Sequence, residues 1–197
     1  MPGPSLIGLT GGIAAGKSEA LRMLTELGAE TISTDAVVHE LLAGDEVRDQ
    51  LVERWGAEVA PDGGVDRGQV GKVVFERPEE LKWLESVLHP LVGKRVIEWR
   101  RGLSEDVEVG VVEVPLLFEG SMAQMFDATI SISAGDAERE RRAAARGTGE
   151  LEARSGRQLS QEEKAALATH AITNDGTLED LRAELERLYP ELRAAGR

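Results

Sequence analysis

Residues 5–18 read Ser-Leu-Ile-Gly-Leu-Thr-Gly-Gly-Ile-Ala-Ala-Gly-Lys-Ser, an apolar run that gives way to glycines and ends in Gly-Lys-Ser. The spacing of Gly11 and Gly16, followed by Lys17 and Ser18, fits the pattern G-x-x-x-x-G-K-[ST]. Apolar residues of strand type precede the loop and apolar residues at helical spacing follow it: Leu6, Ile7 and Leu9, then Ala20, Leu21 and Leu24. The stretch predicts a strand, a phosphate-binding loop and a helix in succession; the alternative is a glycine-rich turn that matches by chance.

Each position of the predicted loop has a physical role. Glycines adopt positive φ and let phosphate oxygens approach the backbone. Backbone N–H groups and the dipole of the following helix attract the anion. Lys17 is expected to reach the β- and γ-phosphates, and the Ser18 hydroxyl to ligate Mg²⁺. The residues predicted to bind ATP here are Gly11, Gly12, Ile13, Ala14, Ala15, Gly16, Lys17, Ser18 and Glu19.

Composition limits the remaining possibilities. The chain of 197 residues has no cysteine, which excludes disulfides and thiolate metal sites. Its 36 acidic and 23 basic residues give a net charge of −13, which argues against non-specific binding of nucleic acid or anionic membranes. Neither a signal peptide nor an apolar run of transmembrane length is evident. We therefore expect a soluble, cytoplasmic protein.

The second predicted strand, residues 30–33, is followed at once by Asp35. In a parallel α/β sheet the carboxyl ends of the strands form the ligand crevice, so Asp35 is a candidate general base for an acceptor hydroxyl. The alternative makes Asp35, or Thr34, the N-cap of a helix over residues 36–42. His39 lies one helical turn further on and shares the face of Asp35.

Residues 44–108 do not continue the alternation of strand and helix. Helical spacing appears over residues 45–55, 69–75 and 78–101, which indicates a helical insertion large enough to cover an acceptor. Pro90 predicts a kink in the last helix or a break between two helices. His89, just before it, either contacts a ligand phosphate or bonds a carbonyl that the kink frees.

Three more strands are predicted, over residues 109–114, 128–133 and 171–173. Glu113 ends the first of them, either as a magnesium-organising acid or as a carboxylate in solvent. A final amphipathic helix begins near Thr177, and the tail after Pro190 is predicted to be loose.

Positive charge concentrates in residues 137–157, which contain six arginines and four glutamates. Arg142 and Arg146 lie four residues apart on one helix face, and Arg154 follows beyond a glycine-containing hinge candidate. Guanidinium groups suit phosphates, so these arginines predict a lid over the phosphates. A solvated helix with Glu–Arg pairs is the alternative.

With these pieces placed, the sequence resembles the bacterial dephospho-CoA kinases from about residue 7 to residue 188. The string Leu-Thr-Gly-Gly-Ile-x-x-Gly-Lys-Ser is similar to that family's but is unspecific by itself among nucleotide-binding proteins. Two later strings, in this order and spacing, are more specific: Leu-His-Pro-Leu at 88–91 and Val-Pro-Leu-Leu-Phe-Glu at 114–119. The remaining matches are Asp35 to His39, Asp66-Arg67 with Phe75, Arg142 with Arg146, and Asn174-Asp175-Gly176.

The resemblance implies that ATP phosphorylates the ribose 3′-hydroxyl of dephospho-CoA to give coenzyme A and ADP. It also implies an α/β phosphate-loop kinase fold, with a five-stranded parallel sheet of order 2-3-1-4-5 flanked by helices. Residues 1–35, 109–136 and 168–197 would form the nucleotide-binding core. Residues 36–108 would form the acceptor-binding insertion and residues 137–167 the lid.

Site residues carry over by the same resemblance. Asp35 is the implied catalytic base, and the catalytic set is Asp35, Lys17, Arg142, Arg146 and Arg154. Asn174 and Gly176 are implied to lie by the ATP base. The acceptor-binding set is Asp35, His39, Arg67, His89 and Leu117.

The chain departs from the family pattern at several positions. Ser33-Thr34-Asp35 stands where the family often has Asp-Ala-Asp, which leaves the base assignment intact and argues against a second carboxylate at the metal. Arg139 replaces a Gln that is usual near the start of the lid.

The nearest alternative function is a related kinase acting on a nucleoside monophosphate or another small alcohol. A GTPase switch is disfavoured because the Asn-Lys-x-Asp motif is absent. The expected partners are ATP and dephospho-CoA, with neither nucleic acid nor membrane, and the chain is expected to be a monomer or weak homo-oligomer.

Overall fold

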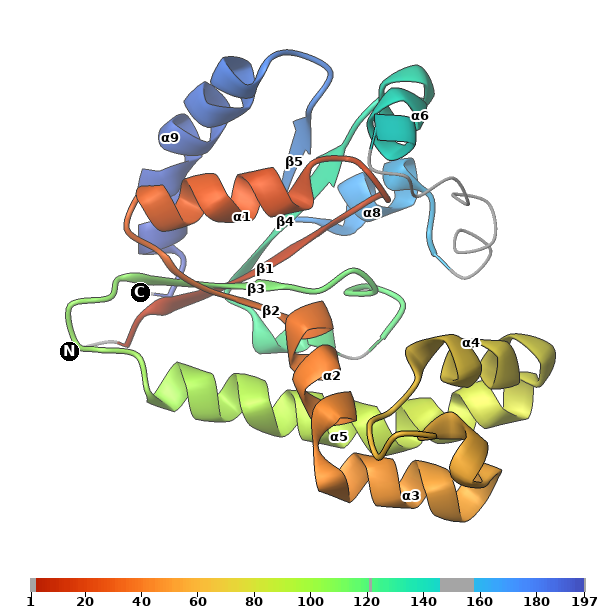
Figure 1. Ribbon diagram of the computed structural model, residues 1–197. Coiled ribbons are helices and arrows are strands. Elements are labelled where there is room, and N and C mark those ends of the chain that lie inside the picture. The colour runs from red at the N-terminus through yellow and green to blue at the C-terminus, as the bar shows by residue number, and fades with distance from the viewer. Residues whose placement is uncertain (1–2, 121, 146–157, 197) are drawn as a thin grey trace. The chain divides into compact units, whose positions relative to one another are not determined.

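The computed structural model describes residues 3–120, 122–145 and 158–196 (Figure 1). The chain divides into two compact units, which are described separately below. The first unit combines Met1–Ser33 with Gly102–Arg197, and the second is the continuous segment Thr34–Arg101.

The first unit is built on a five-stranded sheet of order β2-β3-β1-β4-β5. Its central strand, β1 (Ser5–Gly11), pairs in parallel with β3 (Val109–Glu113) and β4 (Ala128–Ser133). The outer strands β2 (Glu30–Ser33) and β5 (His170–Thr173) are parallel as well. The predicted fold class and strand order are confirmed.

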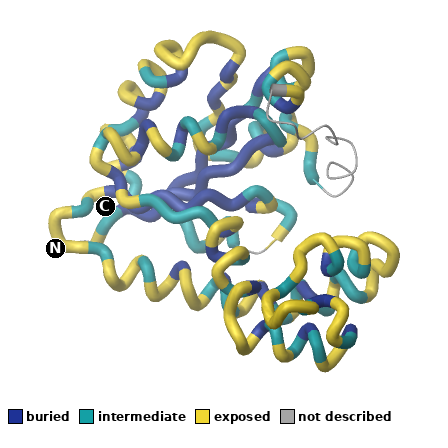
Figure 2. Tube along the Cα trace, viewed as in Figure 1, coloured by how far each residue is buried: buried dark blue, intermediate teal, exposed yellow. Residues whose placement is uncertain are grey.

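Helices flank this sheet. Helix α1 (Lys17–Glu26) and helix α9 (Leu178–Ala194) contact each other, and together with the strands they form the main apolar core. Helix α8 (Gln161–Leu167) contacts β1, β4 and β5, and α6 (Asp136–Ala145) follows β4. A short 3₁₀ helix, η2, covers Met122–Met125. Figure 2 shows deep burial along the central strands β1, β3 and β4, whereas the outer strands are partly exposed.

The chain after Pro190 continues as a helix to Ala194, so the prediction of a loose end was wrong. Helix α9 starts with a capping box between Thr177 and Asp180 and runs through Pro190 to Ala194. Leu192 is fully buried in the core, and the Arg193 guanidinium pairs with the Glu108 carboxylate at 2.5 Å. Burial of Leu192 and this ion pair offset the single backbone hydrogen bond that a proline removes.

The second unit is helical and has its own apolar core. Its elements are α2 (Thr34–Ala43), α3 (Asp45–Trp55), the 3₁₀ helix η1 (Ala57–Val59), α4 (Arg67–Glu76) and α5 (Pro78–Arg101). The buried core residues are Leu42, Val47, Leu51, Trp55, Val59, Val70, Leu84 and Leu88. Helix α5 is continuous through Pro90, so of the two predicted alternatives, a kink and a break, the break was wrong. Leu88 and Val92, on either side of the proline, are both buried and keep the helix packed.

An aromatic and charged cluster fixes α3 against α5 in the second unit. The rings of Trp55 and Trp83 meet edge to face with centroids 5.1 Å apart, and the Arg54 guanidinium lies 4.5 Å from the Trp83 centroid. Arg54 and the Trp55 indole N–H both donate to the Glu80 carboxylate, at 2.5 and 2.7 Å. The hydrogen bond from Arg54 is the main cause that lowers the pKa of Glu80, and Trp55 adds to it.

Candidate active site

The phosphate-loop stretch of the first unit has the predicted strand, loop and helix. β1 ends at Gly11 and α1 begins at Lys17. Gly11 and Gly16 have φ of 150° and 109°, values that favour glycine. A Cβ atom added at Gly11 would lie 2.1 Å from the Ile132 carbonyl oxygen. The glycines are therefore required both by backbone conformation and by close packing.

Lys17 lies across this loop. Its Nζ donates to the carbonyl oxygens of Gly11 at 3.2 Å and Gly12 at 3.0 Å, which holds the ammonium group at the loop. Within the described part of the chain, no side chain caps the N-terminus of α1, where Gly16 occupies the cap position. The backbone donors there are suited to an anion. Ser18 is exposed in the first turn, while Glu19 pairs with Arg22 on the same helix at 3.0 Å.

Two side chains from other elements hold the loop at Ala15. The Asn174 side-chain amide donates to the Ala15 carbonyl oxygen at 2.8 Å, and Arg142 Nη1 donates to the same oxygen at 3.3 Å. Arg142 Nη2 also donates to the Asn174 carbonyl oxygen at 3.0 Å, and its Nε lies 2.7 Å from the Glu138 carboxylate. Arg142 thus lies at the loop. The other two predicted arginines, Arg146 and Arg154, lie outside the described residues.

Gln161 at the start of α8 approaches the loop from another direction. Its side-chain amide exchanges two hydrogen bonds with the Ala134 backbone, at 3.0 and 2.9 Å. A Cβ atom added at Gly12 would lie 2.7 Å from Gln161 Oε1. The sequence reasoning missed Gln161, although the Ser160 and Glu163 capping box that begins α8 is a recognisable local signal.

A buried ion pair ties α8 to the segment after β3. The side chain of Lys164 is 1% exposed and lies 3.0 Å from the Glu119 carboxylate, and it donates to the Pro115 carbonyl oxygen at 2.6 Å. Glu119 also accepts from the Leu159 backbone N–H at 2.8 Å. Leu117, predicted to bind the acceptor, is fully buried in the first unit, and its side chain lies 3.1 Å from a Cβ atom built at Gly8. The Leu117 side chain therefore packs in the interior of the unit. The sequence analysis assigned no role to Lys164.

Replacing Lys164 by methionine is expected to destabilise the first unit by about 3–5 kcal/mol, because the buried Glu119 carboxylate then lacks its cation. Urea unfolding followed by far-ultraviolet circular dichroism measures this. Tryptophan fluorescence does not replace it, since Trp55, Trp83 and Trp99 all belong to the second unit. The control is Lys94→Met at an exposed position, and equal stabilities of the two variants would contradict the prediction.

Glu113 at the end of β3 is 8% exposed, so the alternative of a carboxylate in solvent was wrong. It lies in register with Leu9 on β1 and with Ser33 on β2. The carboxyl ends of these three strands therefore meet beside the start of the loop.

Asp35 and His39 belong to the second unit and are both exposed. Helix α2 begins at Thr34, so neither Thr34 nor Asp35 is an N-cap; the Asp35 carboxylate lies in the first turn, where the helix dipole stabilises it. The N-cap alternative was therefore wrong.

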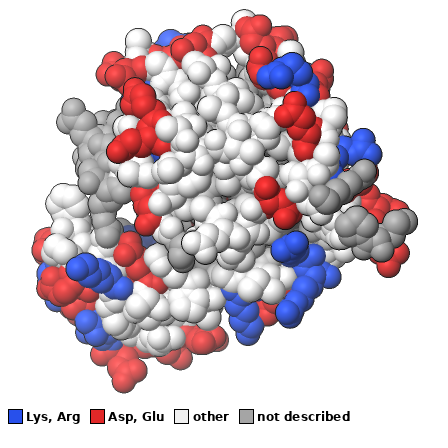
Figure 3. Space-filling view, turned by 180° about the vertical axis from the view of Figure 1, so that it is seen from behind, with Lys and Arg blue, Asp and Glu red and all other residues white. Residues whose placement is uncertain are grey.

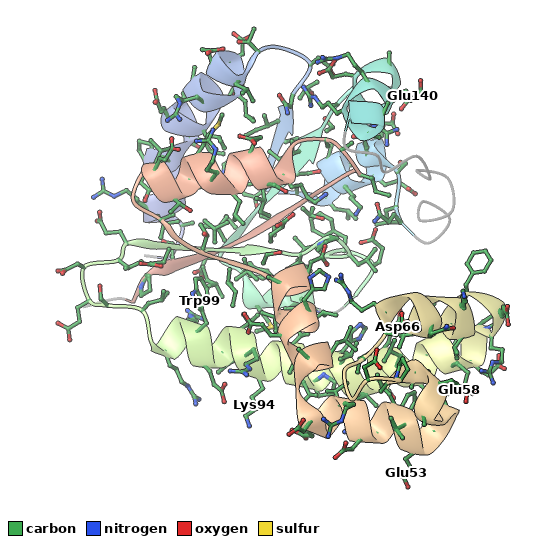
Figure 4. The ribbon with its side chains drawn as sticks, viewed as in Figure 1. Glu53, Glu58, Asp66, Lys94, Trp99 and Glu140 are labelled. Carbon is green, nitrogen blue, oxygen red and sulfur yellow. The ribbon has the colours of Figure 1, made fainter. Side chains whose placement is uncertain are left out.

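The structure brings His39 and Arg67 together. Arg67 Nη1 lies 2.7 Å from His39 Nε2. A guanidinium group only donates, so Arg67 is the donor of this hydrogen bond. Asp66, labelled in Figure 4 at the start of α4, accepts from the N–H groups of Gly68 and Gln69 and so fixes the helix that carries Arg67. His89, on α5, is exposed.

Two open hollows of about 400 Å³ each lie in the first unit, and Thr173 at the end of β5 borders both. One is lined by Asn174, Gly176 and residues of α9, and the other by residues 133–136 and the start of α8. Both are large enough for part of a nucleotide.

The described residues contain no cluster of three or more His, Cys, Asp or Glu side chains arranged to hold a metal ion. Mg²⁺ does not require a complete set of protein ligands, because it commonly takes one or two protein oxygens together with phosphate oxygens and water.

Across the described ranges, no helix is both long and apolar enough to cross a membrane. On the face seen in Figure 3, acidic side chains are spread widely and basic ones form smaller groups.

Comparison with known proteins identifies close similarity to one family. Residues 5–180 match the family model described as dephospho-CoA kinase. A dephospho-CoA kinase of Streptomyces avermitilis is 37% identical over 191 residues, covering 94% of this chain and 93% of the relative. A crystal structure of a Thermus thermophilus protein has a TM-score of 0.83 and 34% identity, covering 96% of this chain and 98% of its own. The dephospho-CoA kinase from Campylobacter jejuni has a TM-score of 0.65 and 25% identity, with 96% and 97% covered.

Proposed function

The chain belongs to the dephospho-CoA kinase family, and we propose from this premise that it transfers the γ-phosphoryl group of ATP to the ribose 3′-hydroxyl of dephospho-CoA. The products are coenzyme A and ADP, so the enzyme is a transferase of coenzyme A synthesis. The observation that carries the proposal is the match over residues 5–180, which includes both the phosphate loop and the helical second unit.

The donor part of the reaction is assigned to the first unit. The glycine-rich loop offers backbone N–H groups to the phosphates of ATP, and Lys17, held at the loop by two carbonyl oxygens, supplies positive charge. Ser18 is the protein ligand proposed for Mg²⁺, and its exposed hydroxyl in the first turn of α1 fits that role. When bound, the metal ion neutralises charge that develops on the phosphate oxygens.

The acceptor part is assigned to the second unit. Asp35 is the proposed general base that accepts the proton of the attacking hydroxyl, and its exposure leaves the carboxylate accessible to substrate. His39, four residues after Asp35, is paired with Arg67, and the two side chains offer N–H donors to an anionic acceptor. His89 is a further proposed contact, whereas the burial of Leu117 makes it a packing residue. Phosphoryl transfer needs positioning and charge neutralisation more than covalent chemistry, which suits this set.

The function is tested by ADP release with a panel of acceptors. The purified protein with ATP and Mg²⁺ is expected to turn over dephospho-CoA, and to show no comparable turnover with nucleoside monophosphates or other small alcohols. Mass spectrometry of the product should find one added phosphate, on the ribose. The proposal fails if dephospho-CoA gives no turnover while another acceptor does.

A further inference from the structure

Of the two side chains that hold the phosphate loop at Ala15, that of Asn174 is buried, and this residue directly follows β5. The resemblance implies that Asn174 lies by the ATP base, yet its side-chain contact runs to the loop itself. We propose that Asn174 is a positioning residue that fixes the peptide between Ala15 and Gly16 for triphosphate binding, and that it does not read the base. This inference rests on the proposed function only in taking the loop as the ATP site.

The side-chain amide, the backbone N–H and the backbone carbonyl of Asn174 each form a hydrogen bond. The side chain is 4% exposed, and its Nδ2 donates to the Ala15 carbonyl oxygen at 2.8 Å. The facing atom is a carbonyl oxygen, so the amide nitrogen and not the amide oxygen must point at it. The backbone N–H donates to the Ser133 carbonyl at 2.7 Å, and the backbone carbonyl accepts from Arg142 at 3.0 Å.

These contacts orient one peptide of the loop. The described chain has no cis peptide bond, and in a trans peptide the C=O and the following N–H point in opposite directions. Asn174 and Arg142 together draw the Ala15 carbonyl to their side. The Gly16 N–H therefore points away from them, which leaves this donor for a phosphate oxygen.

Packing around Gly16 shows how close the two segments lie. A Cβ atom at Gly16 would lie 2.3 Å from Asn174 Nδ2, so a residue with a side chain there could not keep the contact. The φ of 109° at Gly16 favours glycine independently. The glycine and the asparagine thus fit each other, and the pair sets the conformation at the start of α1.

The test separates phosphate positioning from base recognition by using three ligands with the same triphosphate. Dissociation constants of ATP, GTP and inorganic tripolyphosphate, each with Mg²⁺, are measured by calorimetry for the wild type and Asn174→Asp. The substitution places a carboxylate oxygen opposite the Ala15 carbonyl oxygen, so repulsion replaces the hydrogen bond. We expect all three ligands to weaken by a similar factor, roughly tenfold. The KM for ATP should rise while the KM for dephospho-CoA is unchanged.

Two results would overturn the proposal: weakening of ATP alone with tripolyphosphate unaffected, which indicates base recognition, or no change for any ligand. If Asn174→Asp does not fold, Asn174→Ala removes the donor without adding charge, and the same comparison of three ligands applies. Glu179→Gln, at an exposed position on α9, is the control and should bind all three ligands as the wild type does. Because the calorimetric binding measurements use no acceptor, they give their answer even if dephospho-CoA proves not to be the substrate.

Discussion

Asp35→Asn is expected to lower the turnover number with dephospho-CoA by about 10²–10⁴-fold, the usual contribution of a general base. An amide has the shape of the carboxylate but does not take the proton of the attacking hydroxyl. The residue is exposed in the first turn of α2 and caps no helix, so its replacement should leave the fold intact. Steady-state kinetics with both substrates, beside calorimetric ATP binding, measure the effect.

The affinity for ATP provides the sharpest control on this variant. ATP is assigned to the first unit and Asp35 belongs to the second, so the dissociation constant of ATP should be nearly unchanged. Glu40→Gln makes the same chemical change at an exposed position on the same helix and should keep wild-type turnover. Near-wild-type turnover in Asp35→Asn would remove Asp35 as the base.

Lys17→Ala is expected to reduce kcat/KM for ATP by about 10²–10³-fold, as the loss of a preorganised charge-stabilising donor does. The Nζ group is already held at the loop by the carbonyl oxygens of Gly11 and Gly12, so its positive charge is positioned before the phosphates arrive. The variant loses the ammonium group, and the carbonyl oxygens of Gly11 and Gly12 lose their hydrogen bonds to it. Initial rates over a range of ATP concentrations measure the loss.

Lys94→Ala is the matched control, because it removes the same charge from an exposed position on α5 whose nearest carboxylate is 3.8 Å away. It should retain wild-type kinetics. Normal use of ATP by Lys17→Ala would undermine the assignment of residues 11–18 as the phosphate site.

Local pattern was enough to predict the elements around the loop. The apolar run before Gly11 and the helical stripe after Lys17 are both present in residues 5–24, so a short window of sequence determines them. The second strand agrees with the structure to the residue, at 30–33. The strand order came from the family resemblance, because hydrophobic pattern alone does not specify which strands are neighbours.

Proline was misleading in both long helices. Pro90 and Pro190 each lie inside a continuous helix, where rules based on local sequence predict a kink or break and a loose end, respectively. Tertiary packing decided both cases, since apolar residues beside each proline are buried. Burial of this kind depends on partners that are far away in the chain, and a local rule does not include them.

The contacts that hold the candidate site were missed for the same reason. Asn174 and Ala15 are separated by 159 positions in the sequence, and Lys164 bonds a carbonyl 49 positions away. A buried lysine is contrary to the general preference of that residue for the surface, so sequence alone argues against it. Its partner Glu119 lies in the string most typical of the family, which was the one signal available.

The discontinuous first unit has a consequence for synthesis on the ribosome. Strand β1 pairs with β3 and β4, so its neighbours are not made until residues 109–133 have been translated. The buried apolar cluster of the second unit spans Leu42 to Leu88, so its residues are all translated before β3. Domains tend to fold as units while the chain is still growing. Strand β1, all of whose residues are buried in the folded protein, is therefore made before either of its neighbours, and its unpaired backbone and apolar side chains are exposed in the nascent chain until then.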